Sequence, residues 1–173
     1  TPAGALAATS LLFFRRDRAL RRRLTRDELT GLLSQQELHR RVRVWLGQPQ
    51  GTTRRGAFFL VSFEHYAQIS AMLRAGEDQA LLVQVADRIS LVARTLGGMA
   101  ARTGTDSFTV CVSGVDEEGA AQVSAKLLAD LSAPYELGAR PLIAVFRIGA
   151  ALYPAHGRSV QELQRCVQVA VVP

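Results

Sequence analysis

The sequence predicts a single α/β domain in which helices pack on a mixed β-sheet. Two apolar runs, at residues 57–63 and 142–153, have the length and residue types of buried strands. Helical patterns recur around them, as at residues 64–73 and 116–131, and a turn at residues 104–107 separates two further short strands. Helices that recur between strands are typical of a layered α/β fold.

Capping residues and apolar spacing mark the other helices. Ser34 with Glu37, and Ser159 with Glu162, have the spacing of a capping box, in which the Ser hydroxyl and the Glu carboxylate both bond to free amides at a helix start. The run after Gly76 predicts a long helix. Its inward-facing positions are predicted to be Leu82, Val85, Ala86, Ile89, Val92 and Ala93.

The positive charge of the chain is concentrated in one segment. The 173 residues include 21 Lys and Arg and 15 Asp and Glu, which gives a formal net charge of +6. Residues 15–26 hold seven of the basic residues and one acid, so the remainder has 14 of each and no net charge. A nucleic-acid-binding domain spreads basic residues over its folded surface, so we do not expect nucleic acid as a partner.

An apolar segment, residues 3–14, precedes these arginines. It is shorter than the ~20 residues that cross a bilayer, but an apolar segment that ends in Arg is typical of the cytoplasmic end of a membrane helix. We interpret residues 1–26 as the end of such a helix with a basic linker helix, and residues 27–173 as the domain. The alternatives for the segment are an amphipathic linker or a signal-anchor remnant, and the arginines could be solvated or bind anionic lipid.

The cysteines and histidines form no recognisable metal motif. Cys111 lies in an apolar strand-like run and Cys166 on an apolar helical face, and neither has a Cys or His at ligand spacing. His39, His65 and His156 are far apart in the sequence. Both cysteines are therefore predicted to be core residues in a reducing environment.

Four short motifs occur in an order that resembles a known family. They are "DELTGLLSQQEL" (27–38), "ARTGTDSF" (101–108), "RIGAALYP" (147–154) and "ELQRCVQVAV" (162–171). Together they resemble the GGDEF (diguanylate cyclase) family over residues 27–172. The resemblance implies a fold similar to nucleotide cyclases and polymerase palms. It also implies a reaction in which two domains, each holding one GTP, form cyclic di-GMP.

Several positions of the implied nucleotide site carry other residue types than the family. After the first long strand, Ser62 stands where the family has a metal-binding Asp and Ala67 where it has Lys, whereas Glu64 keeps an acid. In the late strand, Arg147 replaces a Ser before Ile-Gly. The alternative for Glu64 is a solvated acid at a helix start, where the helix dipole favours it.

The positions implied to contact guanine or ribose also differ. Ser70 replaces an Asn, and Gln79 falls where the family has an Asp. A shift of one or two residues would bring Asp78 or Glu77 to that position instead.

The signature turn keeps only part of its pattern. Gly104 and Asp106 match, Thr105 replaces the second Gly and Ser107 replaces the second acid. The second Gly would let phosphate approach the backbone and tolerate positive φ, neither of which suits a β-branched residue. The alternative for Asp106 is ordinary turn chemistry, in which its carboxylate bonds nearby amides.

These departures predict a degenerate, non-catalytic regulatory domain that is not an enzyme, with no cofactor beyond weak GTP and Mg²⁺ binding. Asp106 and Glu64 are the only candidate metal ligands, and the inhibitory product site is absent because Thr95 and Gly98 replace its Arg and Asp. The expected partners are an EAL or other output domain in the same chain, a second copy in a homodimer, and the membrane through residues 1–26, at the cytoplasmic face of a bacterial inner membrane. The alternatives are a GTP-sensing domain or a weakly active cyclase that uses Glu64 with Asp106.

Overall fold

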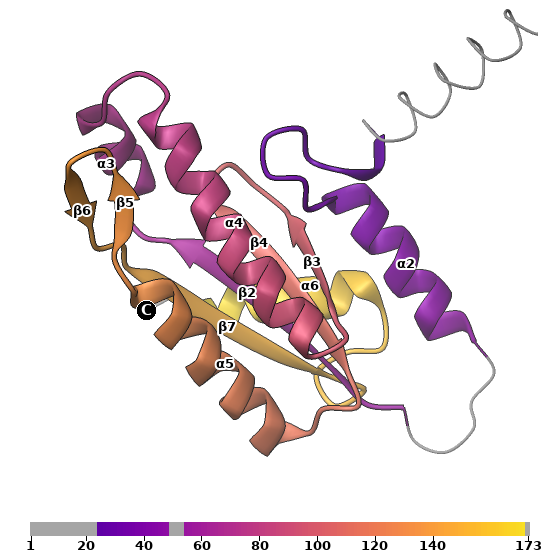
Figure 1. Ribbon diagram of the computed structural model, residues 1–173. Coiled ribbons are helices and arrows are strands. Elements are labelled where there is room, and N and C mark those ends of the chain that lie inside the picture. Colours follow the sequence, from indigo (N-terminus) through magenta and orange to yellow (C-terminus); the bar gives the residue numbers. More distant parts are fainter. Residues whose placement is uncertain (1–23, 49–53, 172–173) are drawn as a thin grey trace, which may run out of the picture.

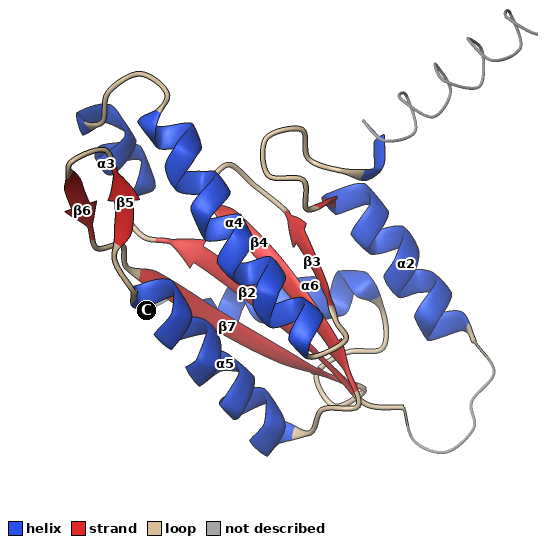
Figure 2. Cartoon of the chain, viewed as in Figure 1, coloured by secondary structure: helices blue, strands red, loops and turns tan. Residues whose placement is uncertain are grey.

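The computed structural model describes residues 24–48 and 54–171, which form a mixed five-stranded sheet with helices on both faces (Figures 1 and 2). The strand order is β1-β3-β4-β2-β7, in which β1 runs parallel to β3 and every other neighbouring pair is antiparallel. The strands are β1 (Leu33–Ser34), β2 (Gly56–Phe63), β3 (Met99–Arg102), β4 (Ser107–Ser113) and β7 (Phe146–Tyr153). The predicted α/β class with a mixed sheet is confirmed.

The helices divide between the two faces of the sheet. They are α2 (Gln35–Gly47), α3 (Tyr66–Met72), α4 (Glu77–Thr95), α5 (Glu117–Ser132) and α6 (Val160–Val171). Helices α4 and α5 cover one face, whereas α6 lies behind the sheet and α2 runs beside β3 (Figure 1). Alternate residues of β2 therefore enter two separate cores, so that Phe59 packs with α4 and α5 and Phe58 packs with α2 and α6.

The inward face of α4 agrees with its apolar spacing. All six predicted positions are buried, and Leu81 joins them with 0% exposure. Arg88, on the same helix, fastens α4 to the end of α5: its guanidinium donates to the carbonyls of Asp130 and Pro134 and lies 3.8 Å from the centre of the Tyr135 ring. Burial is the main reason that the pKa of Tyr135 is raised to about 12.

The start of α2 keeps half of the predicted capping box. The Ser34 hydroxyl accepts a hydrogen bond from the Glu37 amide at 3.2 Å. The Glu37 carboxylate does not bond back to Ser34, because it binds the guanidinium groups of Arg40 and Arg41 at 2.7–2.8 Å. The hydrogen bonds from Arg40 first, and then Arg41, lower the pKa of Glu37 to about 2. At the start of α6, the Glu162 carboxylate accepts a hydrogen bond from the amide of Arg158 and not from that of the predicted cap, Ser159.

Three short strands were not predicted. One is β1, and the other two, β5 (Tyr135–Leu137) and β6 (Arg140–Leu142), form a separate hairpin beside α3 (Figure 1). Gly138, with φ of +62°, lies in the tight turn between them, a conformation that Gly adopts readily. The prediction that one strand spans 142–153 is wrong at its start, because Leu142 belongs to this hairpin and the sheet strand begins at Phe146.

The N-terminal segment that was interpreted as membrane-associated falls largely in residues 1–23, outside the described residues. None of the helices within residues 24–48 and 54–171 is long and apolar enough to cross a membrane. Residues 24–26 contact the domain: the Ser34 hydroxyl donates to the Leu24 carbonyl at 2.9 Å, and Arg26 donates to the Gly31 carbonyl at 2.7 Å.

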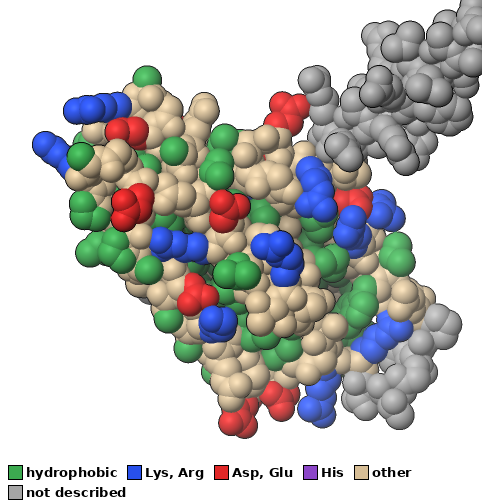
Figure 3. All heavy atoms as spheres, in the orientation of Figure 1, with side chains coloured by type: hydrophobic (Ala, Val, Ile, Leu, Met, Phe, Trp, Pro, Cys, Tyr) green, Lys and Arg blue, Asp and Glu red, His purple; other side chains and the backbone are tan. Residues whose placement is uncertain are grey.

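The outer surface of α4 and α5 carries charges of both signs. Basic and acidic side chains are interspersed over this face (Figure 3), and Lys126 pairs with Asp130 at 3.0 Å. The face therefore presents no continuous basic field.

Burial in the α4 core should dominate the stability of the domain. Leu81→Ala removes a fully buried side chain and is expected to lower the free energy of unfolding by about 2–5 kcal/mol, through lost burial and a residual cavity. The matched control, Met72→Ala, truncates a side chain that is 85% exposed and should change it by less than about 0.5 kcal/mol. Urea unfolding followed by circular dichroism measures both, and equal effects would contradict this packing.

Glu37 should make part of the stability depend on pH. Its pKa is depressed in the folded chain, so its contribution is complete above its unfolded pKa and is lost as pH falls toward the folded value of about 2. The stability difference between the wild type and Glu37→Gln should therefore shrink between about pH 5 and pH 2. Unfolding in urea at several pH values tests this, and a difference that stays constant over this range would exclude the mechanism.

Candidate functional site

The C-terminal end of β2 brings three polar positions into one row across the sheet. The register places Ser62 opposite Ser107 of β4 on one side and opposite Arg147 of β7 on the other. Directly paired residues project from the same face of a sheet, so these three side chains leave the sheet on the same side. We call Ser107, Ser62 and Arg147 the polar row.

The polar row belongs to the face of the sheet that carries α2 and α6. Its neighbours Val61, Phe63 and Phe108 are buried in the opposite core, with α4 and α5. Because side chains alternate along a strand, the row must point away from that core. Ser62 and Ser107 are half-buried and Arg147 is exposed, so the row lies at the margin of the packed interior.

Glu64 adds a carboxylate to this edge, and that carboxylate already has a partner. The Glu64 amide donates to the Val145 carbonyl at 2.9 Å, which ties the end of β2 to the segment before β7. Its Oε2 lies 3.1 Å from Nε of Arg147. Glu64 is therefore not a solvated helix-start acid, the alternative raised by the sequence, because Arg147 holds its side chain.

The signature turn between β3 and β4 is closed by backbone hydrogen bonds. The amides of Thr103 and Gly104 donate to the Ser107 carbonyl at 3.0 and 3.2 Å. Neither Gly104 nor Thr105 has a positive φ. Thr105 is therefore not in the left-handed conformation that a β-branched residue would disfavour. At Gly104 a Cβ would lie 2.3 Å from the Ser107 hydroxyl oxygen, so a larger residue there would require the Ser107 side chain to rotate.

Asp106 leaves its carboxylate free at the tip of the turn. Its backbone carbonyl accepts from the Phe63 amide at 2.9 Å, which joins the turn to β2. Within the described residues its exposed carboxylate accepts no hydrogen bond and forms no ion pair. Ordinary turn chemistry therefore does not explain this acid, and a group from outside the turn can reach it.

Arg102 fastens the turn to the opening segment of the domain. Its Nε and Nη2 donate to the carbonyls of Gly104 and Thr105 at 3.1 and 2.9 Å, and its Nη1 lies 3.4 Å from Oδ1 of Asp27. Asp27 also accepts from the amide and hydroxyl of Thr30 at 2.8 and 2.7 Å. Burial alone would raise the pKa of Asp27, but the Thr30 hydrogen bonds and the Arg102 charge together lower it. We call the contacts of Arg102 the hairpin brace.

The residues implied to contact guanine lie apart from these contacts. Ser70 is in α3, where its carbonyl accepts from the Leu73 amide, and Gln79 is exposed in the first turn of α4. Among the described residues, no hydrogen bond joins either side chain to the polar row. Glu77, one of the acids that could replace Gln79, accepts from the Arg74 amide at 2.8 Å and so caps the turn before α4.

The donor set at this edge does not fit the divalent metal ion that the family resemblance implies. Such an ion takes carboxylate and carbonyl oxygens. Here the Glu64 carboxylate is held by a guanidinium at 3.1 Å, and the polar row contributes two neutral hydroxyls and a cation. Among the acids of this edge, only the exposed carboxylate of Asp106 is left to hold an ion. Within residues 24–48 and 54–171, no group of three or more His, Cys, Asp or Glu side chains could hold a metal.

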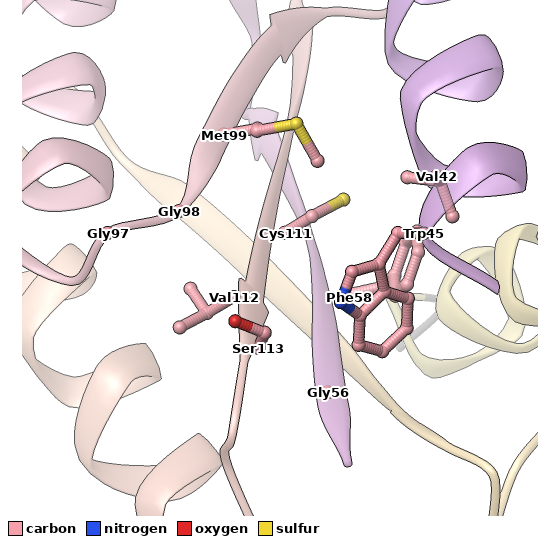
Figure 4. A pocket seen from close by; sticks show the side chains of 10 residues that line it. All are labelled: Val42, Trp45, Gly56, Phe58, Gly97, Gly98, Met99, Cys111, Val112 and Ser113. Carbon is pink, nitrogen blue, oxygen red and sulfur yellow. The ribbon is translucent and has the colours of Figure 1, made fainter. Parts of the chain in front are cut away.

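A cavity of about 170 Å³ lies at the other end of the β3–β4 hairpin (Figure 4). Its walls include Trp45, Phe58, Met99 and Cys111, and they are mainly apolar. Cys111 is buried, as predicted, and burial raises the pKa of its thiol, which disfavours a thiolate nucleophile. Cys166 is half-buried and packs against the core that α2 and α6 form with the sheet. The cavity lining therefore includes no acid or base to act on a nucleotide.

Sequence reasoning noted Arg147 only as a departure and missed Arg102 altogether. The place of Arg147 beside the other site residues could have been found by pairing the predicted strands, because the neighbours of a residue in a sheet lie on other strands. For Arg102 the sequence offers one signal, which is its position two residues before the turn glycine, Gly104. Its partner Asp27 lies 75 residues away, a separation that local patterns do not reveal.

Comparison with known proteins agrees with this fold. Residues 24–172 match the family described as "Diguanylate cyclase, GGDEF domain". The chain is 28% identical over 159 residues to the bifunctional diguanylate cyclase/cyclic di-GMP phosphodiesterase MucR of Pseudomonas aeruginosa, covering 92% of this chain and 23% of that protein. It is 27% identical over 156 residues to the cyclic di-GMP phosphodiesterase NbdA of the same organism, covering 88% and 19%.

A solved structure supports the same assignment. A sensory box/GGDEF family protein from Caulobacter crescentus superimposes with a TM-score of 0.77 and 27% identity, over 85% of this chain and 95% of that one. By contrast, the chain spans only about a fifth of the length of MucR and NbdA.

These matches correct one expectation. The altered site residues led us to predict that the chain is not an enzyme, but the family match, MucR and the superimposed GGDEF structure point to an enzyme-type domain. Residue replacement at single positions is not enough to establish that a domain of this family has no activity. The chain belongs to the GGDEF domain family of diguanylate cyclases.

Proposed function

We propose that this chain is the GTP-binding signalling domain of a multi-domain cyclic di-GMP protein, in which GTP binds at the polar row and the signature turn. The observation that carries the proposal is the hairpin brace. Arg102 contacts both the turn and Asp27, which follows the N-terminal segment directly. A displacement of that segment would therefore alter the turn, and a nucleotide at the turn would affect the segment in return.

The site chemistry supports a nucleotide at this edge. The polar row supplies hydroxyl and guanidinium donors of the kind that recognise phosphate. The turn stays fixed by its backbone bonds and by Arg102, so little ordering is needed when a ligand binds.

The placement of the domain in its protein is also part of the proposal. The names of MucR and NbdA both include a cyclic di-GMP phosphodiesterase, and their length leaves room for such a domain beside the matched region. We infer that the present chain relays a signal from a membrane-proximal N-terminal region to an output domain of EAL type, and that two copies associate through their GGDEF domains.

A second candidate function is synthesis of cyclic di-GMP, favoured by the free carboxylate of Asp106. It is the acid of this edge that lacks a partner among the described residues, so it is the group available to accept a proton from a ribose hydroxyl. If this activity is present, Glu64→Ala and Asp106→Ala should each abolish product formation, because both carboxylates of the edge would be required. Product analysis by chromatography after incubation with GTP measures it.

GTP should bind saturably, and Arg102→Met should weaken that binding by about tenfold, because the turn loses its charged hydrogen bonds. Calorimetric titration measures both, and faster hydrogen exchange at the Thr103 and Gly104 amides would show that the turn has loosened. The control is Arg94→Met, which removes an exposed guanidinium outside the site. Absence of saturable heat at millimolar GTP, or equal affinities for both variants, would contradict the proposal.

The N-terminal segment should confer membrane binding. The full chain is expected to sediment with vesicles that contain phosphatidylserine, because each Arg near an anionic surface contributes about 1 kcal/mol. A variant that lacks residues 1–23 keeps Leu24 and Arg26 with their contacts to the domain, so it should stay folded but remain in the supernatant. Sedimentation of that variant with the vesicles would exclude this placement of the membrane contact.

A further inference from the structure

We propose that the guanidinium group of Arg147 binds a phosphate group of the nucleotide directly, at the place where this edge lacks the donors for a divalent ion. The Ser62 and Ser107 hydroxyls would contribute hydrogen bonds beside it. The inference rests on the proposed function, because it specifies how this chain would hold the triphosphate.

The register of the sheet makes the three groups neighbours. Ser62 pairs with both Ser107 and Arg147, so the row crosses β4, β2 and β7 without a gap. The Cβ atoms of directly opposite residues lie about 4.5–5.5 Å apart, so Ser62 is within reach of both partners. Ser107 and Arg147 are two strands, or about 10 Å, apart, and the length of the Arg side chain would bring its guanidinium to a shared phosphate. Strand pairing on both sides of β2 keeps these distances fixed.

Each member of the row has hydrogen-bonding capacity that the described residues do not use. Nε of Arg147 lies 3.1 Å from Oε2 of Glu64, and the two terminal nitrogens donate no hydrogen bond to a described residue. The hydroxyls of Ser62 and Ser107 likewise form no hydrogen bond with a described residue. Phosphate oxygens would accept hydrogen bonds from these donors, and the charge of the guanidinium makes its own bonds the strongest of them.

Glu64 holds Arg147 in the orientation that this role requires. A guanidinium group is a planar fork, so a carboxylate bound at Nε leaves the terminal nitrogens for a second anion. The Arg147 side chain is 42% exposed and that of Glu64 21%, which leaves the outer side of the fork accessible. Arg147 would thus lie between a protein carboxylate and a phosphate, as a bound metal ion commonly does.

The remaining charges at this edge limit the site to Arg147. Arg102 is committed to Asp27 and to two carbonyls of the turn. Asp106 and Glu64 are acidic, so they oppose an anion in the absence of a cation. Arg147 is therefore the cation on which phosphate binding depends, and its charge persists at every physiological pH.

The first test compares GTP affinity in Mg²⁺ and in EDTA, using the full 173-residue chain. The wild-type Kd should change by less than about threefold when Mg²⁺ is removed, whereas Arg147→Ser should weaken binding in EDTA by about 10- to 100-fold, the range expected for charge-assisted hydrogen bonds. The matched control is Arg158→Ser, which lies beyond the opposite end of β7 and should bind as the wild type does. A wild-type Kd that rises more than tenfold in EDTA, or equal affinities for both Arg variants, would overturn the inference.

The second test restores an acid to the row. The double variant Ser62→Asp, Arg147→Ser replaces a donor and the cation by a carboxylate and a hydroxyl, so its GTP binding should become dependent on Mg²⁺. If the double variant binds GTP equally well with Mg²⁺ and with EDTA, the row does not determine the metal requirement and the inference fails.

Inorganic tripolyphosphate separates this inference from the proposed function. Binding of tripolyphosphate in EDTA that is lost in Arg147→Ser supports the phosphate site even if GTP itself fails to bind, an outcome that would refute only the proposed function. Binding of GTP that requires Mg²⁺, without binding of tripolyphosphate in EDTA, would refute the direct phosphate contact and leave the proposed function standing.

Discussion

The double pairing of β2 is the constraint on which the rest of the structure depends. With β4 on one side and β7 on the other, β2 separates two cores and fixes which of its residues enter each. A slip of one residue would turn Phe59 and Val61 out of the α4 core and bury Ser62 in it, at a large cost in free energy. The same register that buries the apolar residues therefore places Ser107, Ser62 and Arg147 together at the edge.

Compared with the residues that the family resemblance implies, this edge has fewer acids and an added guanidinium group. Acids that the family resemblance implies at Ser62 and Ser107 have become hydroxyls, and a guanidinium group stands beside them. Glu64, which could have served a metal, is bound to that guanidinium at 3.1 Å. Under the proposed phosphate contact these replacements are mutually consistent, because each would exchange a ligand for cations for a hydrogen-bond donor.

The sequence predicted most of the fold because its signals are local. The inward face of α4 follows from helical spacing, and Ser34 caps α2 through a hydrogen bond to a residue only three positions away. The short β5–β6 hairpin escaped because three-residue strands have no periodicity to detect. The Arg102–Asp27 and Arg147–Glu64 contacts escaped because they join residues distant in sequence, and residue-by-residue comparison treated Arg147 as a mismatch.

A crystal structure of the chain grown with GTP in the presence of EDTA tests the central claim most directly. Direct binding predicts phosphate oxygens at hydrogen-bond distance, about 2.7–3.2 Å, from the terminal nitrogens of Arg147, with Ser62 or Ser107 beside them and Glu64 still on Nε. A triphosphate bound elsewhere on the chain, with Arg147 contacting only Glu64, would contradict it.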